Sequence, residues 1–364
     1  MAAERNLPAD LRLLVTGGAG FVGANLCVAL AGRHPAWEVV AFDNLKRRGS
    51  ELNVPRLREA GVRLVHGDVR EPDDLLALDE HHALVECSAE PSALAGVDGN
   101  TAYALRTNLL GAYHCLELAR RDDAQVVFLS TSRVYPFAAL DAAAHVETDT
   151  RFELASEQTL PGITPAGVSE SFPLEGARTL YGATKLAAEL LVTEYAAAFG
   201  LRTVVDRCGV IAGPWQMGKV DQGVFSFWLM SHYFGHDLRY IGYGGAGKQV
   251  RDLMHIDDLV DLIEAQLLAP DHWTGVTANV GGGREVSLSL RETTELCREL
   301  TGNAPAVAET EEERPGDVRL YLSDCRRLFD HSDWRPRRDA RRTLADTLDW
   351  IEHNERAVRS ALIG

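Results

Sequence analysis

The chain has 364 residues, of which 46% are hydrophobic and 25% are charged, and its formal net charge is −16. This length and apolar content allow a large buried core and favour two lobes. The negative charge argues against a nucleic acid or an anionic membrane surface as a partner, because both attract clustered Lys and Arg, and no apolar run approaches the roughly 20 residues that span a bilayer.

The chain begins with a polar segment, residues 1–10, that lacks the apolar core of a signal peptide. We therefore expect a cytoplasmic protein. The six cysteines are scattered without paired spacing, which favours small buried side chains over a disulfide or a metal site. His232 and His236 stand four residues apart, but no third ligand lies near them, so no metal is expected.

Short apolar segments alternate with helical patterns through the first 207 residues. Strands are predicted at 11–16, 37–43, 62–66, 82–87, 124–130 and 202–207, and helices at about 20–32, 49–60, 102–121 and 179–199. Such alternation is typical of parallel strands with helices on both faces of the sheet. We therefore predict an α/β fold with a doubly wound parallel sheet.

The first predicted strand leads directly into a glycine-rich turn, Gly17-Gly18-Ala19-Gly20-Phe21-Val22-Gly23, and Asp43 ends the second strand. Gly17 allows the tight turn, Gly20 lets the backbone approach a pyrophosphate, and Gly23 lets the helix pack closely on the strand. The helix N-terminus offers free N–H groups to the phosphates. Asp43 can accept both hydroxyls of an adenosine ribose and repels a 2′-phosphate. The pattern predicts a Rossmann-type domain that binds NAD.

The pattern changes after residue 135. Residues 136–178 show no clear period and are too many for an ordinary connection, so we predict a long active-site loop there. From residue 208 onward the elements become shorter, which suits a smaller substrate-binding lobe. We expect residues 10–207 to form the NAD-binding domain and 208–364 to form mainly the second lobe, with about 249–280 returning to the first.

Two segments carry the candidate chemistry. Tyr181 and Lys185 stand four residues apart on a predicted helix and therefore share one face. A phenol with a pKa of about 10 is a poor base at neutral pH, but a fixed ammonium and the positive nicotinamide of an oxidised cofactor both favour the phenolate. The third group is expected at the end of the fifth strand, where ligands bind in such sheets. Thr131 is our candidate for the hydroxyl that binds the reacting oxygen, with Ser132 as the alternative.

These motifs resemble those of the extended short-chain dehydrogenase/reductases that act on nucleotide sugars. The shared segments are TGGAGFVG at 16–23, Ser-Thr-Ser before Val-Tyr within 130–135, YGATK at 181–185, RDLMHIDD at 251–258 and RPGD at 314–317. The resemblance implies that Arg251 and Arg314 hold a nucleotide diphosphate, which suits the bidentate guanidinium. It implies further substrate contacts by Ser132, Arg133 and Gln222, and cofactor contacts by Asn44, Asp68, Val69, Ser88, Asn108, Tyr181 and Lys185.

The residues after Thr131 narrow the reaction that the resemblance implies. The 4,6-dehydratases of the family carry an Asp-Glu or Asp-Lys pair at this place, whereas this chain has Ser132-Arg133, which disfavours elimination. Asp43 opposes the NADPH that reductases of the family use, although Arg47 and Arg48 stand nearby. What remains is epimerisation through a transient keto sugar.

Two segments of the second lobe, Asp221-Gln222-Gly223-Val224 and GKQVRD at 247–252, resemble the branch of the family that inverts carbon 2 of a CDP-linked sugar. The alternatives are a nucleotide-sugar 4-epimerase, another nucleotide-sugar oxidoreductase or dehydratase of the family, and a dinucleotide-sensing protein of the same fold. Sensing proteins commonly lose the Tyr or the Lys of the YxxxK motif, and this chain keeps both.

The predicted helices at 102–121 and 179–199 carry apolar or small residues on more than one face, so each has a second surface to bury. In the resembling family these helices pair between subunits, and we expect a homodimer or a tetramer. His255 and Asp257 are interpreted as structural residues that cap the helix from 257 to 268.

Overall fold

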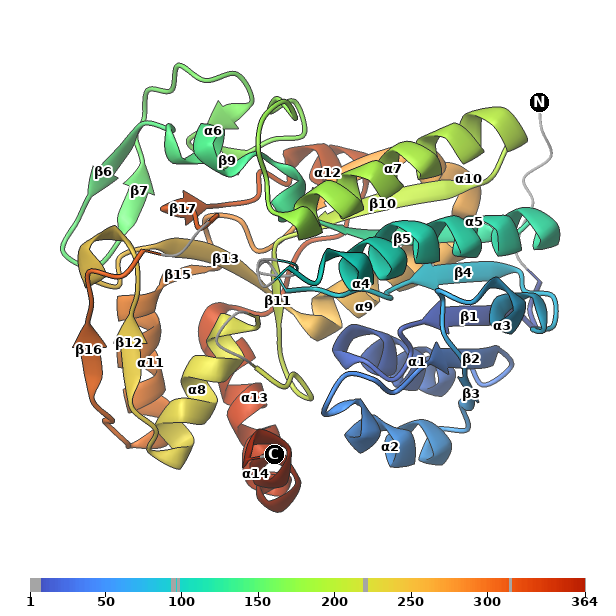
Figure 1. The fold of residues 1–364 in the computed structure, drawn as a ribbon, viewed down its shortest axis with the longest axis horizontal. Helices are drawn as coiled ribbons and strands as arrows, with labels where there is room; N and C mark the ends of the chain where they lie inside the picture. Colours follow the sequence, from blue (N-terminus) through green and yellow to red (C-terminus); the bar gives the residue numbers. More distant parts are fainter. Residues whose placement is uncertain (1–7, 93–95, 97–98, 219–221, 314–315, 364) are drawn as a thin grey trace.

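The computed structural model describes residues 8–92, 96, 99–218, 222–313 and 316–363, and within them a seven-stranded sheet forms the centre of the larger part of the molecule (Figure 1). The strand order is β14-β10-β5-β4-β1-β2-β3. The bounds are Arg12–Thr16 for β1, Glu38–Asp43 for β2, Arg63–His66 for β3, Ala83–Glu86 for β4, Gln125–Thr131 for β5, Thr203–Cys208 for β10 and Val276–Val280 for β14. Every neighbouring pair is parallel, which confirms the predicted α/β class.

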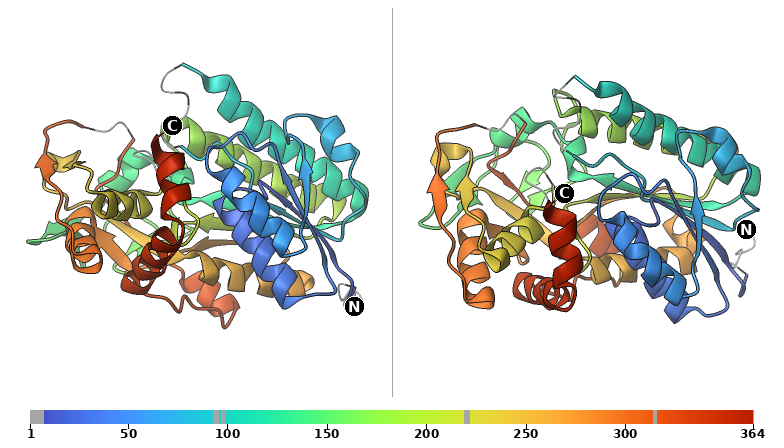
Figure 2. Two further views of the ribbon diagram at one scale, coloured as in Figure 1. Left: turned by 90° about the horizontal axis from the view of Figure 1, so that it is seen from below. Right: turned by 60° about the horizontal axis from the view of Figure 1, so that its bottom comes forward.

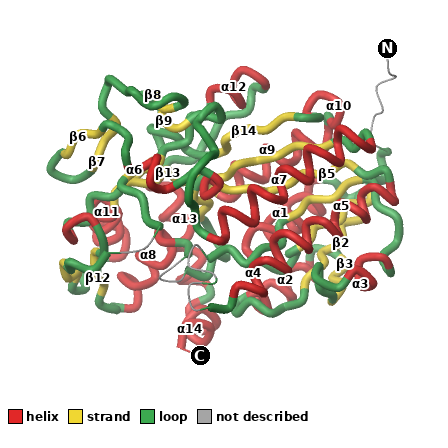
Figure 3. The backbone as a smooth tube through the Cα atoms, turned by 45° about the horizontal axis from the view of Figure 1, so that its top comes forward, coloured by secondary structure: helices red, strands yellow, loops and turns green. Residues whose placement is uncertain are grey.

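Helices cover both faces of this sheet (Figure 3). One face carries α1 (Phe21–Arg33), α2 (Asn53–Glu59) and α9 (Ile256–Leu268), and the other carries α3 (Pro72–Leu76), α5 (Gly111–Asp122) and α7 (Leu180–Phe199). Leu26 and Leu259 belong to the apolar core of the first face, and Leu116 and Val192 to that of the second. Because both faces are covered, a central strand such as β5 is buried along its whole length.

The helix predicted at 102–121 is divided in the structure. α4 (Thr101–Leu105) leads into a π-helical turn, η2 (Arg106–Leu110), and the chain continues as α5. Such turns are frequent at functional sites. Asn108 lies in this turn, and its Nδ2 donates to Thr184 Oγ1 of α7 over 3.1 Å. The turn therefore holds a buried amide against the helix that carries Tyr181.

The smaller part contains a four-stranded sheet in the described part of the chain, formed by β11 (Val210–Ala212), β13 (Val250–His255), β15 (Ser287–Ser289) and β17 (Leu320–Tyr321). A separate parallel pair joins β12 (Leu238–Tyr240) to β16 (Val307–Glu309). Trp228, Leu253 and Leu344 belong to the apolar core here. The helices of this part are α8 (Val224–Phe234), α11 (Leu290–Thr301), α13 (Ala340–His353) and α14 (Glu355–Ile363), whereas α10 (Pro270–Trp273) and α12 (Arg326–His331) lie near β14. None of the helices in the described ranges has the length and apolar character needed to cross a membrane.

The segment predicted as a long irregular loop, residues 136–178, contains short regular elements. They are α6 (Phe137–Asp141), the hairpin of β6 (His145–Glu147) with β7 (Phe152–Leu154), and the hairpin of β8 (Ile163–Thr164) with β9 (Gly167–Val168). Phe152 and Phe172 belong to an apolar cluster that also contains Val250 and Leu320 of the smaller part. The segment is therefore packed rather than loose.

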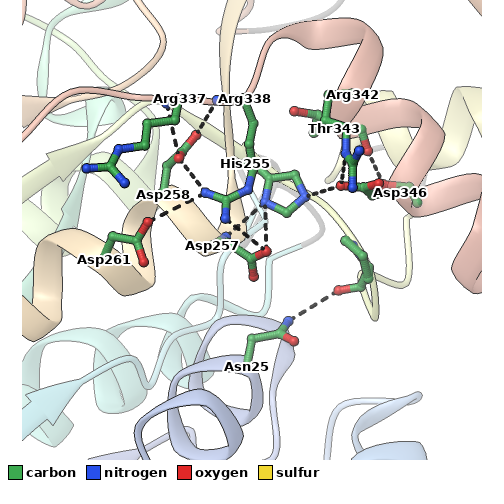
Figure 4. Close-up of polar contacts among 12 residues, drawn as sticks. Asn25, His255, Asp257, Asp258, Asp261, Arg337, Arg338, Arg342, Thr343 and Asp346 are labelled. Carbon is green, nitrogen blue, oxygen red and sulfur yellow. Dashed lines mark hydrogen bonds and ion pairs between the residues drawn. The ribbon is translucent and has the colours of Figure 1, made fainter. Parts of the chain in front are cut away.

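The two parts meet at the end of β13 (Figure 4). His255 is the N-cap of α9, and its Nδ1 accepts a hydrogen bond of 3.0 Å from the Asp257 N–H, which confirms the capping prediction for His255; Asp257 contributes its backbone N–H. His255 Nε2 faces Asp346 of α13 at 3.5 Å, and Arg338 contacts Asp258 of α9 at 2.6 Å. α13 and α14 lie on the side of the smaller part that faces the larger part (Figure 2).

Candidate active site

The turn between β1 and α1 forms a cradle for an anionic ligand. Gly17 has a φ of +65°, in the left-handed region that other residues rarely adopt, and a Cβ on Gly23 would lie 2.3 Å from Gly17 O. Gly20, the N-cap of α1, has no side-chain cap. The N–H groups of the first helical turn are therefore left for a ligand, as a pyrophosphate site requires.

Asp43 lies beside this turn at the end of β2. Its Oδ2 accepts from the Ala19 N–H at 3.0 Å, and its Oδ1 accepts from the Leu45 N–H at 2.7 Å. Burial raises the pKa of Asp43, while the backbone donors act in the opposite direction. Arg47 donates to Gln222, and Arg48 donates to Ser360 O over 2.9 Å. Both cations near Asp43 therefore contact the smaller part of the molecule.

Asn44 and Asp68 line a shallow cavity of about 300 Å³ at the ends of β2 and β3. Asn44 Nδ2 donates to Asp68 Oδ2 over 2.9 Å, and Arg70 Nε donates to Asp68 Oδ1 over 2.9 Å. Although burial acts to raise the pKa of Asp68, the hydrogen bonds from Arg70 outweigh it and lower the pKa to about 2. The cavity lies at the carboxyl edge of the sheet, where cofactors of doubly wound folds bind.

Three further cofactor candidates are buried inside the protein. Val69 is buried and packs closely against Gly111 of α5, where a Cβ atom would lie only 2.7 Å from the Val69 side chain. Asn108 is only 1% exposed, and its Oδ1 accepts from the Glu90 N–H at 2.7 Å. Ser88 is also buried, and its Oγ has no hydrogen-bond partner among the residues that the structure describes. Asn108 therefore braces the chain that follows β4.

A cavity of about 450 Å³ opens at the carboxyl ends of β5 and β10 and extends to the smaller part. Its lining includes the three catalytic candidates, Thr131, Tyr181 and Lys185. The first turn of α1 adds Phe21 and Val22. The substrate-binding candidates in the lining are Ser132, Arg133, Gln222 and Arg251. Arg314 lies outside the described residues.

Tyr181 stands in the first turn of α7, where Thr179 caps the helix by accepting from the Gly182 N–H at 3.2 Å. Burial raises the pKa of Tyr181, whereas the charge of Lys185 and a hydrogen bond from the Thr131 side chain lower it. A Cβ on Gly182 would lie 2.0 Å from Arg133 O. The glycine in YGATK therefore lets α7 approach the end of β5.

Lys185 is 2% exposed and pairs with an acid that sequence reasoning missed. Its Nζ lies 3.2 Å from Glu86 Oε2 and 4.0 Å from the centre of the Phe128 ring. Glu86 ends β4 and is also buried. Burial raises the pKa of Glu86, and Lys185 opposes that rise. The available signal was a single charged residue at the end of an otherwise apolar strand.

The cavity lining also carries two arginines, Arg133 and Arg251. Arg133 Nη1 donates to Gly316 O over 3.1 Å, and Arg251 Nη2 lies 2.5 Å from Asp317 Oδ1. Burial lowers the pKa of Arg133, the charge of Arg251 lowers it further, and Asp317 raises it. Arg251 is thus paired with a carboxylate, whereas Arg133 contacts a backbone carbonyl, and two guanidinium groups in one cavity suit an anionic ligand such as a diphosphate. No cluster of three or more candidate metal ligands occurs in the described part of the chain.

Comparison with known proteins gives consistent matches along the chain. The model of the NAD dependent epimerase/dehydratase family matches residues 13–281. CDP-paratose 2-epimerase of Salmonella typhi is 29% identical over 93% of this chain and 99% of that protein. dTDP-glucose 4,6-dehydratase of Streptomyces antibioticus is 30% identical over 94% of this chain and 93% of that protein. The crystal structure of Thermus thermophilus UDP-glucose 4-epimerase in complex with NAD has a TM-score of 0.74 and 25% identity, and the match covers 94% of this chain and 99% of that one.

Proposed function

Since the chain belongs to the NAD dependent epimerase/dehydratase family, we propose that it is a nucleotide-sugar epimerase that inverts one sugar carbon through a transient keto sugar. Its cofactor in this proposal is NAD, held by the glycine turn, Asp43 and the cavity that contains Asn44 and Asp68. The free N–H groups at the start of α1 and the orphaned Ser88 hydroxyl fit such a ligand.

The observation that favours epimerisation over elimination is the absence of a carboxylate beside Thr131. Ser132 and Arg133 follow it, and among described residues the cavity is lined by two carboxylates only, Asp237 and Asp317. Asp317 is paired with Arg251, and Asp237 is exposed. A 4,6-elimination needs an acid and a base beside the reacting carbons, and this wall supplies cations instead.

In the proposed cycle Tyr181 takes the proton of the sugar hydroxyl, and the same phenol returns it after the keto sugar has turned over in the cavity. Lys185 favours the phenolate by its charge, and the Thr131 hydroxyl binds the reacting oxygen. Bound NAD would supply reversible hydride transfer at the sugar carbon, so no outside reductant would be consumed. The residues of the cavity wall must therefore keep the keto sugar from leaving.

For the substrate we propose a CDP-sugar that is inverted at carbon 2. This assignment is supported by the identity to CDP-paratose 2-epimerase and by the segment around Gln222. Arg251 and Arg314 would bind the diphosphate, with Arg133 closer to the reacting sugar. A nucleotide-sugar 4-epimerase is the second candidate, because UDP-glucose 4-epimerase of Corynebacterium glutamicum is 26% identical over 92% of this chain.

We also propose a homodimer or a pair of dimers. Large apolar side chains are exposed on α4, η2, α5 and α7, namely Leu105, Leu110, Tyr113, Leu190 and Phe199. α5 and α7 lie side by side on one face of the sheet (Figure 3). A second copy that covers these helices would bury the patch.

A panel of CDP-, UDP-, GDP- and dTDP-sugars, followed by NMR, tests the proposal. We expect an equilibrium between two epimers of one nucleotide sugar without loss of water. Deuterium at the inverted carbon should be retained, and product formed in heavy water should gain none there. Loss of water from the sugar would instead make the protein a dehydratase, and solvent deuterium at the inverted carbon would exclude the hydride cycle.

A further inference from the structure

A buried carboxylate lies directly behind the catalytic pair. Glu86 Oε2 is 3.2 Å from Lys185 Nζ, and the Ser88 backbone donates to the same carboxylate. Lys185 stands one helical turn after Tyr181, so the acid, the ammonium and the phenol follow one another from β4 to the cavity. The proposed cycle assigns no role to Glu86.

Three buried thiols lie within electrostatic range of Lys185. Cys87 follows β4, Cys115 lies on α5 and Cys208 ends β10, and burial raises the pKa of each thiol. Asp206 and Asp252 face Cys208, and Arg133 faces Tyr181 from the η3 turn (Ser132–Val134). Among the described residues that act on Tyr181, Glu86 is the carboxylate, and its charge acts against that of Lys185.

We propose that Glu86 is a positioning residue that holds the Lys185 ammonium behind Tyr181 and, by its own charge, keeps the phenol able to return its proton. The inference rests on the proposed function, because an epimerase uses one phenol in both directions within a turnover. The charge of Lys185 favours the phenolate and the charge of Glu86 opposes it, so the Glu86–Lys185 pair adjusts how readily the phenol gives up and takes back its proton. A base that serves both half-reactions works best when its pKa lies close to the working pH.

The test is a titration of Tyr181 in the protein without sugar, by NMR of tyrosine labelled with ¹³C at Cζ. The Tyr181 signal is the one that is missing in Tyr181→Phe. Glu86→Gln keeps the shape and one acceptor for Lys185 but removes the charge, so the titration midpoint should fall by about one pH unit. Glu86→Asp keeps the charge, and its midpoint should stay within about 0.3 of wild type. Lys185→Met should move the midpoint in the opposite direction to Glu86→Gln.

An unchanged or higher midpoint in folded Glu86→Gln would overturn the inference, even if the variant melts at a lower temperature. Should Glu86→Gln not fold, the wild-type protein labelled with ¹³C at glutamate Cδ answers the same question. The Glu86 signal, identified with Glu86→Asp, should show an inflection at the Tyr181 midpoint that disappears in Tyr181→Phe, and its absence would refute the coupling. Because neither titration needs a sugar, a sugar panel without product would count against the proposed function alone.

Discussion

Two buried ion pairs lie one turn apart on α7, and they are built differently. Among the residues that the structure describes, Lys185 Nζ contacts one carboxylate, that of Glu86, at 3.2 Å. Glu189 accepts from both Nε and Nη2 of Arg207, at 3.1 and 2.7 Å, and also from the Ser130 hydroxyl. The Glu189 carboxylate thus uses most of its acceptor positions. In the Lys185–Glu86 pair, most of the ammonium donors and carboxylate acceptor positions are left for other partners.

The two pairs therefore have different roles on the same helix, one structural and one chemical. A bidentate guanidinium–carboxylate pair fixes geometry, and here it ties α7 to β10 beneath the site. An ammonium with one buried partner keeps donors for a ligand and can alter the pKa of its neighbour. The Glu189–Arg207 pair (the lower pair) should therefore govern folding, and the Lys185–Glu86 pair (the upper pair) should govern proton transfer.

The largest expected effect is on turnover. Tyr181→Phe removes the phenol next to the upper pair and should lower the epimerisation rate by roughly 10² or more, because a positioned general base is lost. NAD binding and thermal stability should stay close to wild type, since the ring is retained. The measurement is NMR of product formation under single-turnover conditions.

Tyr195→Phe is the matched control for this variant. Tyr195 lies on the same helix, but its hydroxyl donates to Glu117 at 2.5 Å, outside the cavity lining. The turnover of Tyr195→Phe should equal that of the wild-type protein. Equal losses in the two variants would show that packing on α7, rather than the Tyr181 hydroxyl, determines the rate.

The lower pair should show the reverse pattern. Glu189→Gln leaves the buried Arg207 guanidinium without its counter-ion and should reduce the free energy of unfolding by about 3 kcal/mol. Urea unfolding measures this change, and turnover per folded molecule should remain within about twofold of wild type. Glu194→Gln, at an exposed position of α7, should change stability by less than about 0.5 kcal/mol. A rate loss as large as that of Tyr181→Phe would contradict the division of roles.

Asp206, next to Arg207 on β10, differs from Glu189 because its buried carboxyl group has few hydrogen-bond partners. Gln266 Nε2 donates to its Oδ1 over 2.9 Å, while Oδ2 has no partner in the described ranges. Burial raises the pKa of Asp206 from 3.8 to about 7. The folded state therefore binds this proton more tightly than the unfolded state, and the contribution of Asp206 to stability falls as pH rises between these two values.

Asp206→Asn should remove this dependence. From pH 5 to pH 8 the wild-type free energy of unfolding should lose about 2.6 kcal/mol more than that of the variant, from the one-group linkage relation. Urea unfolding at the two pH values measures the difference. Identical pH dependence in both proteins would mean that Asp206 stays ionised in the folded state throughout this range.

A smaller effect is expected at the cofactor end, away from both pairs. Asp43→Ala removes a predicted ribose partner and the acceptor for the Ala19 N–H, so NAD affinity should fall by about tenfold, the loss of roughly one charge-assisted hydrogen bond. The preference for NAD over NADP should narrow as well. Calorimetric titration with both cofactors measures the two changes. Stoichiometric NADP extracted from wild-type protein would contradict the role given to Asp43.

The smallest effect on the single chain is expected on the outer face of α7, opposite the two pairs. Leu190 is 63% exposed, and Leu190→Glu should leave the fold and the buried pairs intact while weakening self-association. Light scattering at micromolar concentration measures the oligomer. Leu268→Glu, at a similarly exposed position of α9, is the control that should leave it unchanged. A wild-type monomer would overturn the predicted dimer.

The sequence predicted the elements with strong periodicity and local chemistry. The six predicted strands up to residue 208, the glycine turn and the helix with Tyr181 and Lys185 are all in the structure. These features depend on residues that are close together in the chain, and their patterns are visible without a fold.

What the sequence did not reveal depends on contacts between distant residues or on very short elements. Lys185 and Glu86 are 99 positions apart, and no local pattern links them. The hairpins within 136–178 have strands of two or three residues, too short for a period. The π turn η2 also escaped notice, because its composition continues that of the helices on either side.

The position of β14 has a consequence for how the protein is made. A ribosome that has released residues up to 208 has delivered six of the seven strands that the described sheet contains, but β14 and α9 are still missing. Until residue 280 emerges, β10 presents an open edge, and the sheet face that α9 covers is exposed to water. Such edges recruit other chains. The nascent protein therefore passes through an aggregation-sensitive interval of about seventy residues of synthesis, which chaperones that bind open sheet edges would protect.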